Sequence, residues 1–366
     1  MKSPDLFSSP EGSQKLLKAI HKMAPELGLV RLMEVCGTHT MAIAKAGLKQ
    51  LLPSNIRLIS GPGCPVCVTP AGAMDQILAL SQRPGLTIAS YGDLLRVPGS
   101  HPGDSLLRRK ALGASVQTVY SPMDALNLAV RHPQQQVLFI AVGFETTAPG
   151  TAACLLEAKE KNILNFSVFS LLKTTMPAMK LVASSAQSAV NGFLCPGHVA
   201  VITGSRAFSF LAQEFHLPAV ISGFEPGDLI ASLYWLIKML YEQKPAVRNE
   251  YTRLVRPEGN PLALNAMEEV FTPQDSLWRG LGKIPDSGLA LRKTFSSWDG
   301  SVKYALQPEL GTEIPGCSCG QIIQGLMEPE ECPLFGSRCT PSDPVGPCMV
   351  SSEGSCAAAW RYHPVN

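Results

Sequence analysis

Cysteines are the residues of this chain with the most chemistry to offer, and six of the eleven crowd the last fifty residues. They are Cys317, Cys319, Cys332, Cys339, Cys348 and Cys356. Thiolates are ligands that iron–sulfur clusters and zinc prefer, and either group takes four of them. Zinc sites commonly use closely paired cysteines, whereas the spacings after Cys319 are long and irregular. We therefore predict an iron–sulfur cluster beside a surplus thiol pair that exchanges electrons with it. A structural zinc site with two spare thiols is the alternative.

Three more cysteines lie in two short motifs near the N-terminus, Cys36-Gly-Thr-His39 and Cys64-Pro-Val-Cys67. A Cys-x-x-Cys sequence directly after a strand suits a redox pair or two metal ligands. A thiol and an imidazole three residues apart suit a metal site, or a thiolate activated by a base. The alternatives are a glycine–proline turn with incidental cysteines for the second motif, and a capping or surface role for His39.

Glu145 is a further candidate, in the segment Gly143-Phe-Glu-Thr-Thr147. Its carboxylate could accept a proton during a reaction, or could cap the helix that follows. His198 also has two possible roles, as a site residue or as an ordinary turn residue. Cys154 and Cys195 have no patterned partner, and buried free cysteines are common, so we assign them no role.

The elements that must position these residues follow one repeated pattern: a short apolar run, a polar loop and a helix-like segment. The runs are Leu29–Val35, Ile56–Ser60, Thr87–Tyr91, Val116–Tyr120, Val137–Val142, Ser167–Leu172, His198–Thr203 and Ala219–Ser222. Near-continuous apolar runs are typical of strands buried on both faces, and their alternation with helices indicates parallel α/β sheets. Ligands of such sheets bind beyond the carboxyl ends of the strands. We therefore expect Cys36, Cys64 and Cys67 on one rim.

The chain divides into four predicted parts. Gly-Phe-Glu occurs after two predicted strands, at Gly143 and at Gly223, which hints at two related α/β lobes. We predict an N-terminal extension or helix over residues 1–27, a lobe with the N-terminal cysteines over 28–133, a second lobe over 134–300, and a cluster domain over 301–366. Glycine, proline and cysteine dominate the end of the chain, so a bound cluster rather than an apolar core must order it.

Composition narrows the class of protein. A formal charge of +2 with 16% charged residues gives no basic stripe of the kind that nucleic-acid binding requires. The first ten residues lack the basic start and apolar core of a signal peptide, and no apolar stretch reaches the roughly 18 residues of a membrane span. We expect a cytoplasmic protein without nucleic-acid or membrane partners, whose cysteines serve metal or redox chemistry.

Taken together and in order, the motifs resemble those of the HypD family of [NiFe]-hydrogenase maturation factors. They are Cys36-Gly-Thr-His-Thr40, Gly61-Pro-Gly-Cys-Pro-Val-Cys67, Tyr91-Gly-Asp-Leu-Leu-Arg-Val-Pro-Gly-Ser100, Gly143-Phe-Glu-Thr-Thr147, Pro196-Gly-His-Val199, and Cys317-Ser-Cys319 through Gly346-Pro-Cys348 to Cys356. The resemblance runs from about residue 30 to the C-terminus. It implies a redox scaffold, rather than a conventional turnover enzyme, on which an iron atom acquires cyanide and carbon monoxide. The implied partners are the small chaperone HypC and the cyanide donor HypE.

Carried over residue by residue, the resemblance implies that Cys36 binds that iron, and that Cys64 and Cys67 form a thiol pair able to close as a disulfide. His39 and Glu145 match motif residues near the iron. The C-terminal segment resembles the cluster region of ferredoxin:thioredoxin reductase, which implies a [4Fe–4S] cluster on Cys317, Cys332, Cys339 and Cys356 and a redox pair of Cys319 and Cys348. A stand-alone disulfide reductase of that type, with no partner chaperone, is the alternative function.

Overall fold

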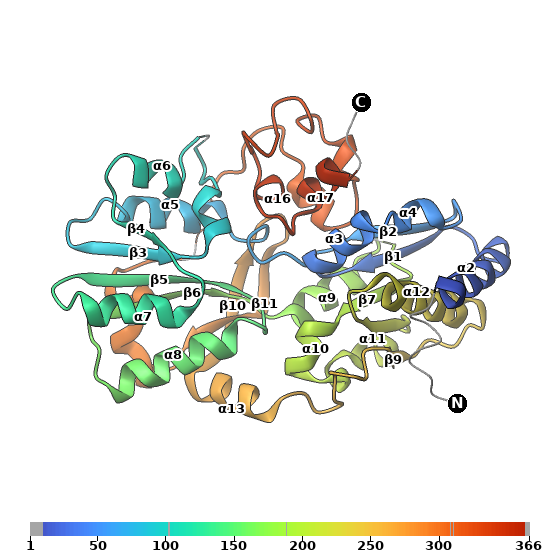
Figure 1. Ribbon diagram of the computed structural model, residues 1–366, viewed down its shortest axis with the longest axis horizontal. Coiled ribbons are helices and arrows are strands. Elements are labelled where there is room, and N and C mark those ends of the chain that lie inside the picture. The colour runs from blue at the N-terminus through green and yellow to red at the C-terminus, as the bar shows by residue number, and fades with distance from the viewer. Residues whose placement is uncertain (1–9, 102, 188, 308, 310, 363–366) are drawn as a thin grey trace.

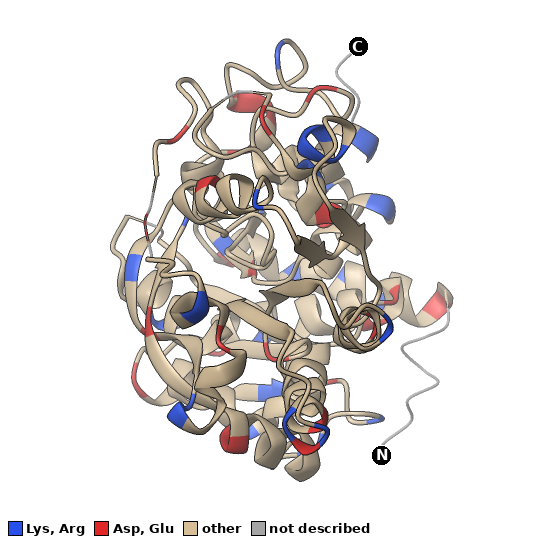
Figure 2. Ribbon diagram, turned by 90° about the vertical axis from the view of Figure 1, so that its left-hand side faces the viewer, with Lys and Arg blue, Asp and Glu red and all other residues tan. Residues whose placement is uncertain are grey.

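The computed structural model describes residues 10–101, 103–187, 189–307, 309 and 311–362. Its strands form two parallel sheets and one antiparallel hairpin, and helices flank both sheets (Figure 1). The predicted α/β class, with two parallel sheets and a cysteine-bearing C-terminal segment, is confirmed. Acidic and basic residues are interspersed over the face seen in Figure 2. Within the described residues, no helix has the length and apolar character needed to cross a membrane.

The first sheet has five parallel strands in the order β2-β1-β7-β8-β9. They are β1 (Val30–Glu34), β2 (Ile56–Ser60), β7 (Gly192–Pro196), β8 (Ala219–Ser222) and β9 (Val247–Asn249). Helices α2 (Pro10–Met23), α3 (Gly37–Lys45), α4 (Leu48–Leu51) and α12 (Pro226–Tyr241) pack on one face, and α9 (Thr175–Ser184), α10 (Gly197–Thr203) and α11 (Phe210–Gln213) on the other. Successive strand residues point to opposite faces, so Leu32 joins one core and Met33 the other.

The second sheet has four parallel strands in the order β4-β3-β5-β6. They are β3 (Leu86–Ser90), β4 (Val116–Thr118), β5 (Gln136–Gly143) and β6 (Phe166–Leu172). Helices α7 (Pro122–Arg131) and α8 (Ala148–Glu160) pack on one face, and α5 (Ala71–Leu80) and α6 (Leu106–Ala111) on the other. A hairpin of β10 (Phe271–Trp278) and β11 (Gly282–Leu291), which the sequence analysis did not predict, lies beside β6, where the Ser170 hydroxyl donates to the Leu289 carbonyl at 2.6 Å.

The remaining elements are short. They are η1 (Ala24–Glu26), η2 (Gly92–Arg96), η3 (Ser205–Phe208), α13 (Pro261–Val270), η4 (Lys293–Trp298), α14 (Gly300–Lys303), α15 (Cys319–Ile323), η5 (Pro329–Glu331), α16 (Pro347–Val350) and α17 (Ser355–Tyr362). The last four belong to the C-terminal segment, in which α17 packs against α3 of the first sheet. Of the predicted N-terminal extension, residues 10–23 form helix α2, and residues 1–9 lie outside the described residues.

Two predictions about the sheets need correction. The chain forms β1 and β2, then all of the second sheet, and then returns for β7 to β9. The predicted boundary at residue 133 therefore does not divide the sheets, because β3 and β5 pair across it. The strand predicted over His198–Thr203 is wrong, since these residues form α10 and the strand is β7 directly before it. Valine and isoleucine favour strands, so their presence in this helix led to the wrong prediction. Strand β7 ends at Pro196, and the helix begins at the next residue.

Candidate functional site

Cys36 lies where β1 ends and α3 begins. Its backbone is extended (φ −156°, ψ 117°), and its side chain is buried, with 1% exposed. Its Sγ lies 3.9 Å from both ring nitrogens of His198, which lies in the first turn of α10 beyond the neighbouring strand β7. Burial raises the pKa of the Cys36 thiol. A thiolate at this position therefore needs a positive partner, such as a metal ion.

Glu34 fixes the turn that carries Cys36. One carboxylate oxygen accepts a hydrogen bond from the Cys36 backbone N–H at 3.0 Å, and the other accepts from the Thr40 hydroxyl at 2.5 Å. The side chain is buried, and burial raises its pKa to about 7. The sequence analysis did not single out Glu34, although an acidic residue at the end of an apolar strand was the available signal.

Near the Cys36 thiol, His39 and His198 contact the second Gly-Phe-Glu motif. Nε2 of His39 lies 3.0 Å from the Gly223 carbonyl oxygen, and its Nδ1 is buried with no hydrogen-bond partner among the described residues. The Phe224 ring packs against His39 at 4.8 Å and stacks on His198 at 5.2 Å. Burial lowers the pKa of both imidazoles to about 4, so each ring is neutral near pH 7 and keeps a lone pair for a metal or a proton donor.

A buried disulfide joins Cys64 and Cys67 in the loop after β2. This loop lies against the Cys36 turn, where the Gly37 amide donates to the Gly63 carbonyl at 3.1 Å. A Cβ on Gly63 would lie 2.1 Å from the Cys36 backbone nitrogen, so only glycine permits the approach. The three N-terminal cysteines thus share one rim, because β1 and β2 are adjacent parallel strands.

The C-terminal cysteines surround a small cavity. Five of the six line it: Cys317, Cys319, Cys332, Cys339 and Cys356. Sγ of Cys317 and Sγ of Cys319 are 3.2 Å apart, and a Cβ on Gly346 would lie 2.6 Å from either sulfur. Cys348 is not among the lining residues, but its thiol interacts electrostatically with that of Cys319. The four predicted cluster ligands converge, and Cys319 lies between the cavity and Cys348.

The Cys64–Cys67 disulfide and the C-terminal cysteines belong to one buried core. Cys64 and Cys67 pack in the same cluster of side chains as the C-terminal cysteines, together with Trp278 and Met349. Sγ of Cys67 lies 3.8 Å from the carbonyl oxygen of Pro347, the residue before Cys348. No group of three or more His, Cys, Asp or Glu side chains in the described part of the chain is arranged to hold a single metal ion.

A second contact ties the C-terminal segment to the Cys36 turn. The Thr38 hydroxyl donates to a Glu353 carboxylate oxygen at 2.8 Å. Gly37 packs so closely on Glu353 that a Cβ would lie 2.4 Å from the Glu353 Cβ. The C-terminal segment therefore touches the Cys36 turn as well as the disulfide loop.

Glu145 is placed differently. It follows β5, and its two carboxylate oxygens accept hydrogen bonds from the backbone N–H and the hydroxyl of Thr175, both at 2.7 Å. Thr175 opens α9, so the carboxylate caps that helix, although not the helix directly after it in the chain. The neighbouring Phe144 stacks on Trp278 at 5.8 Å, which places this motif against the cysteine-rich core. Burial raises the pKa of Glu145.

Comparison with known proteins decides the family. The family model described as HypD, Hydrogenase formation hypA family, matches residues 11–363. The chain belongs to the HypD family. Hydrogenase maturation factor HypD2 of Bradyrhizobium diazoefficiens is 43% identical, over 99% of this chain and 97% of that protein. Hydrogenase maturation factor HypD of Escherichia coli strain K12 is 41% identical over 99% and 98%, and hydrogenase expression/formation protein HupD of Azotobacter chroococcum is 42% identical over 99% and 97%.

Membership of the HypD family confirms the resemblance drawn from the motifs. The names of the relatives favour hydrogenase maturation, and none favours a stand-alone disulfide reductase. The cysteine-lined cavity of this HypD-family chain is compatible with an iron–sulfur cluster. Cys154 and Cys195, to which the sequence assigned no role, are buried in helix α8 and strand β7.

Proposed function

We propose that this chain is a hydrogenase maturation factor that serves as scaffold and electron donor for assembly of the Fe(CN)2CO group of [NiFe]-hydrogenase. The convergence of the buried Cys36 thiol, the Cys64–Cys67 disulfide and the C-terminal cysteines carries the proposal. Cyanide and carbon monoxide favour low-valent iron, so the assembling metal needs soft thiolate ligands beside a source of electrons. The names of the relatives agree with this reading.

The iron atom is cargo, and we place it on Cys36. His198 lies 3.9 Å from that sulfur and can act as a neutral donor, and the sequence analysis left open whether it is a site residue or an ordinary turn residue. Glu34 holds the backbone N–H of Cys36 and thereby fixes the direction of its side chain. His39 anchors the Gly223 turn, which keeps the Phe224 ring against His198. A thiolate and one imidazole leave positions on iron for cyanide, carbon monoxide and a ligand from a partner.

The cysteine-lined cavity suits the [4Fe–4S] cluster that the family resemblance implies. Cys317, Cys332, Cys339 and Cys356 would hold it, and when bound it supplies single electrons. All four are among the lining residues, and the cavity walls are otherwise mostly apolar, with Ile322, Leu334, Phe335 and Met349. Such walls exclude water from thiolate ligands, which tunes the potential of a cluster.

Electrons would reach the iron site by thiol–disulfide exchange. A thiolate of the reduced Cys319/Cys348 pair attacks one sulfur of the Cys64–Cys67 disulfide, and that S–S bond breaks. The second thiol of the pair then resolves the mixed disulfide. Two electrons and two protons move to Cys64 and Cys67, and a Cys319–Cys348 disulfide remains. The contact between Cys67 and Pro347, next to Cys348, supports this direction of transfer.

A HypC-type chaperone and a HypE-type cyanide donor are the proposed partners. Maturation implies other maturation proteins, and the Cys36 side chain offers a bound iron only one sulfur. A chaperone that contributes a further ligand, and a donor that delivers cyanide, complete what this chain lacks.

Replacing Cys36 with alanine tests the iron site. Cys36→Ala should abolish hydrogenase maturation, with more than a hundredfold loss of hydrogenase activity in complemented cells, while the visible absorbance of the cluster stays intact. Cys154→Ala is the matched control, because Cys154 is equally buried and lies in the other sheet's core. Active hydrogenase from the Cys36→Ala strain would show that the iron binds elsewhere.

A further inference from the structure

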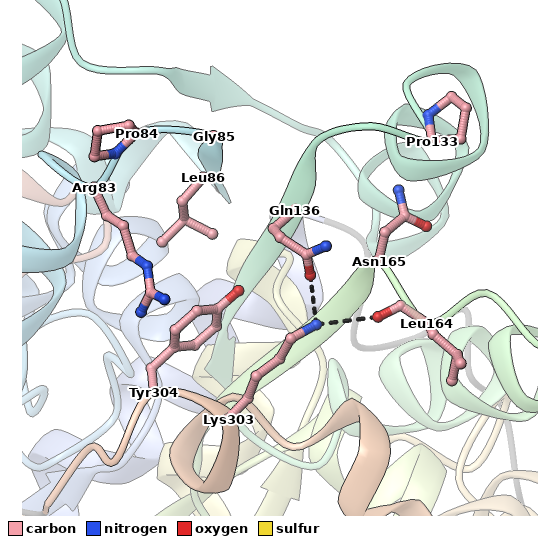
Figure 3. A pocket seen from close by; sticks show the side chains of 10 residues that line it. All are labelled: Arg83, Pro84, Gly85, Leu86, Pro133, Gln136, Leu164, Asn165, Lys303 and Tyr304. Atoms are coloured by element: carbon pink, nitrogen blue, oxygen red, sulfur yellow. Dashed lines mark hydrogen bonds between the residues drawn. The ribbon is translucent and has the colours of Figure 1, made fainter.

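A second cavity, which no cysteine lines, lies at the amino ends of three strands of the second sheet. Its walls include Leu86 at the start of β3, Gln136 at the start of β5, and Asn165 just before β6 (Figure 3). The cavity has a volume of about 580 Å³, within the usual range for small-molecule sites. Glu145 and Lys173 follow the opposite, carboxyl ends of β5 and β6, so this cavity is separate from the proposed redox site.

The cavity is lined by basic and neutral residues only. Arg83 and Lys303 are its charged residues, and no aspartate or glutamate lines it. Neither cation forms an ion pair with a carboxylate among the described residues, whereas Arg109 in the adjacent hollow pairs with Asp104 at 2.6 Å. Two cations without a counterion in one concave site create a positive potential that an anion would relieve.

Neutral groups hold both cations in place. The Lys303 ammonium donates to the Gln136 Oε1 at 2.6 Å and to the Leu164 carbonyl at 3.0 Å, as the dashed lines of Figure 3 show. An ammonium group has three N–H donors, so these two bonds leave one for a ligand. The Arg83 guanidinium lies over the Tyr304 ring at 5.4 Å, and it donates no hydrogen bond to a described residue.

Partial burial lowers the pKa of Lys303, because desolvation disfavours its charged form, and a neighbouring anion would favour that form. The Tyr304 ring orders the Arg83 guanidinium from one face without neutralising its charge. The planar guanidinium can then bind two oxygens of one anionic group. Figure 3 shows the Tyr304 ring between Arg83 and Lys303, and all three residues line the cavity.

We propose that this cavity binds a small ligand through a phosphate or carboxylate group, with Arg83 and Lys303 as its two charged contacts. The proposal goes beyond hydrogenase maturation and stands or falls separately from it. Phosphate and carboxylate share the oxyanion chemistry that an arginine fork recognises, and they differ in charge and shape. A ligand at this edge of the second sheet would contact the scaffold and not the bound iron.

Titration calorimetry on the full-length protein in a low-salt chloride buffer tests the site, with inorganic phosphate and citrate as separate probes. We expect saturable one-site binding of at least one probe. Arg83→Gln and Lys303→Gln should each weaken that binding at least tenfold, and the double variant should abolish it. Arg206→Gln is the matched control, because Arg206 is an exposed arginine in the part of the chain that builds the first sheet.

The outcomes separate cleanly. Binding by phosphate alone identifies a phosphate site, and binding by citrate alone identifies a carboxylate site. The proposal is overturned if neither probe gives a saturable isotherm, or if Arg83→Gln and Lys303→Gln bind as tightly as the Arg206→Gln control. Circular dichroism and thermal melting of each variant show whether it is folded, and Lys303→Arg, which keeps the charge, should retain binding within about threefold.

Discussion

The two cysteine regions of this protein are built in opposite ways. Cys36, Cys64 and Cys67 follow neighbouring parallel strands, and the backbone N–H groups of Cys36 and Gly37, which donate to the Glu34 carboxylate and the Gly63 carbonyl, fix the turns that carry them. The C-terminal cysteines lie in a segment whose longest helix, α17, has eight residues. Five of its cysteines are buried, and they pack with Ile322, Ile323 and Met349 of the segment against Trp278 of β10.

This difference shows where each region obtains its order. The Cys36 region takes its geometry from a sheet with an apolar core on each face, so we expect it to form without a metal. The C-terminal region has little apolar core of its own, so we expect it to depend on the proposed cluster, as small metal-binding domains depend on their metals. Under the proposed function, the sheet-borne site would receive and release iron, and the other would keep its cofactor.

The largest expected effect comes from removing a proposed cluster ligand. Cys332→Ala should lower amide hydrogen-exchange protection across residues 311–362 on the order of 100-fold, because the group that orders the segment is lost. Protection of β1, β2 and β7 should change little. Cys36→Ala is the control, and it should leave both regions protected. Equal protection in wild type and Cys332→Ala would remove the distinction between the regions.

A smaller effect is expected from crowding the sheet-borne site. In Gly63→Ala the new Cβ would meet the Cys36 backbone nitrogen, which rigid strands hold in place. We expect a loss of about 2–3 kcal/mol in the free energy of unfolding and a tenfold or greater loss of maturation. Gly28→Ala is the matched control, because nothing lies within 4 Å of its Cβ position. Denaturant unfolding and hydrogenase activity measure the two effects, and unchanged values for both would contradict the packing described.

The smallest effect is a pH dependence at Lys173, which follows β6. Burial lowers the pKa of Lys173 from 10.5 to about 7, and its ammonium donates to neutral oxygens of Ser276 and Leu277. Between pH 7 and pH 10.5 the unfolded chain binds up to one proton more at this residue, so the folded state gains stability as pH rises. The unfolding free energy of wild type minus that of Lys173→Met should rise by about 1 kcal/mol from pH 7 to pH 8.

Exposed Lys283→Met is the control for that experiment and should show no such growth. The same slope should appear in the Cys332→Ala background, because Lys173 belongs to the part of the protein that folds without the cluster. A slope that disappears with the cluster would mean that the two regions are ordered together.

The sequence analysis located most of the fold and the site for identifiable reasons. Ile56–Ser60 and Ala219–Ser222 were predicted with the bounds that β2 and β8 have, because strands buried on both faces are apolar throughout. The clustering of Cys36, Cys64 and Cys67 followed from the rule that strand ends carry ligand loops. The return of the chain to the first sheet was missed, since local patterns do not reveal which strands pair.

The site residues show the same limit. His198 was named as a possible site residue but assigned to a strand, which hid its place in the first turn of α10, and only the pairing of β1 with β7 brings it to Cys36. Glu34 was read as part of a strand, and its hydrogen bonds depend on the turn that follows. Phe224 was noticed as a repeated tripeptide, but its stacking on His198 requires the order of strands in the sheet.

Anaerobic purification with iron and acid-labile sulfide quantified tests the central claim most directly. Five cysteines line the C-terminal cavity, and of these we assign Cys319 to the redox pair and the other four to the cluster. Cys319→Ala should keep the full iron and sulfide content of the wild type, Cys332→Ala should lose the sulfide, and Cys36→Ala should keep it. Loss of sulfide in Cys319→Ala would contradict the separation of an electron-donating cluster from the thiol pair that serves the iron at Cys36.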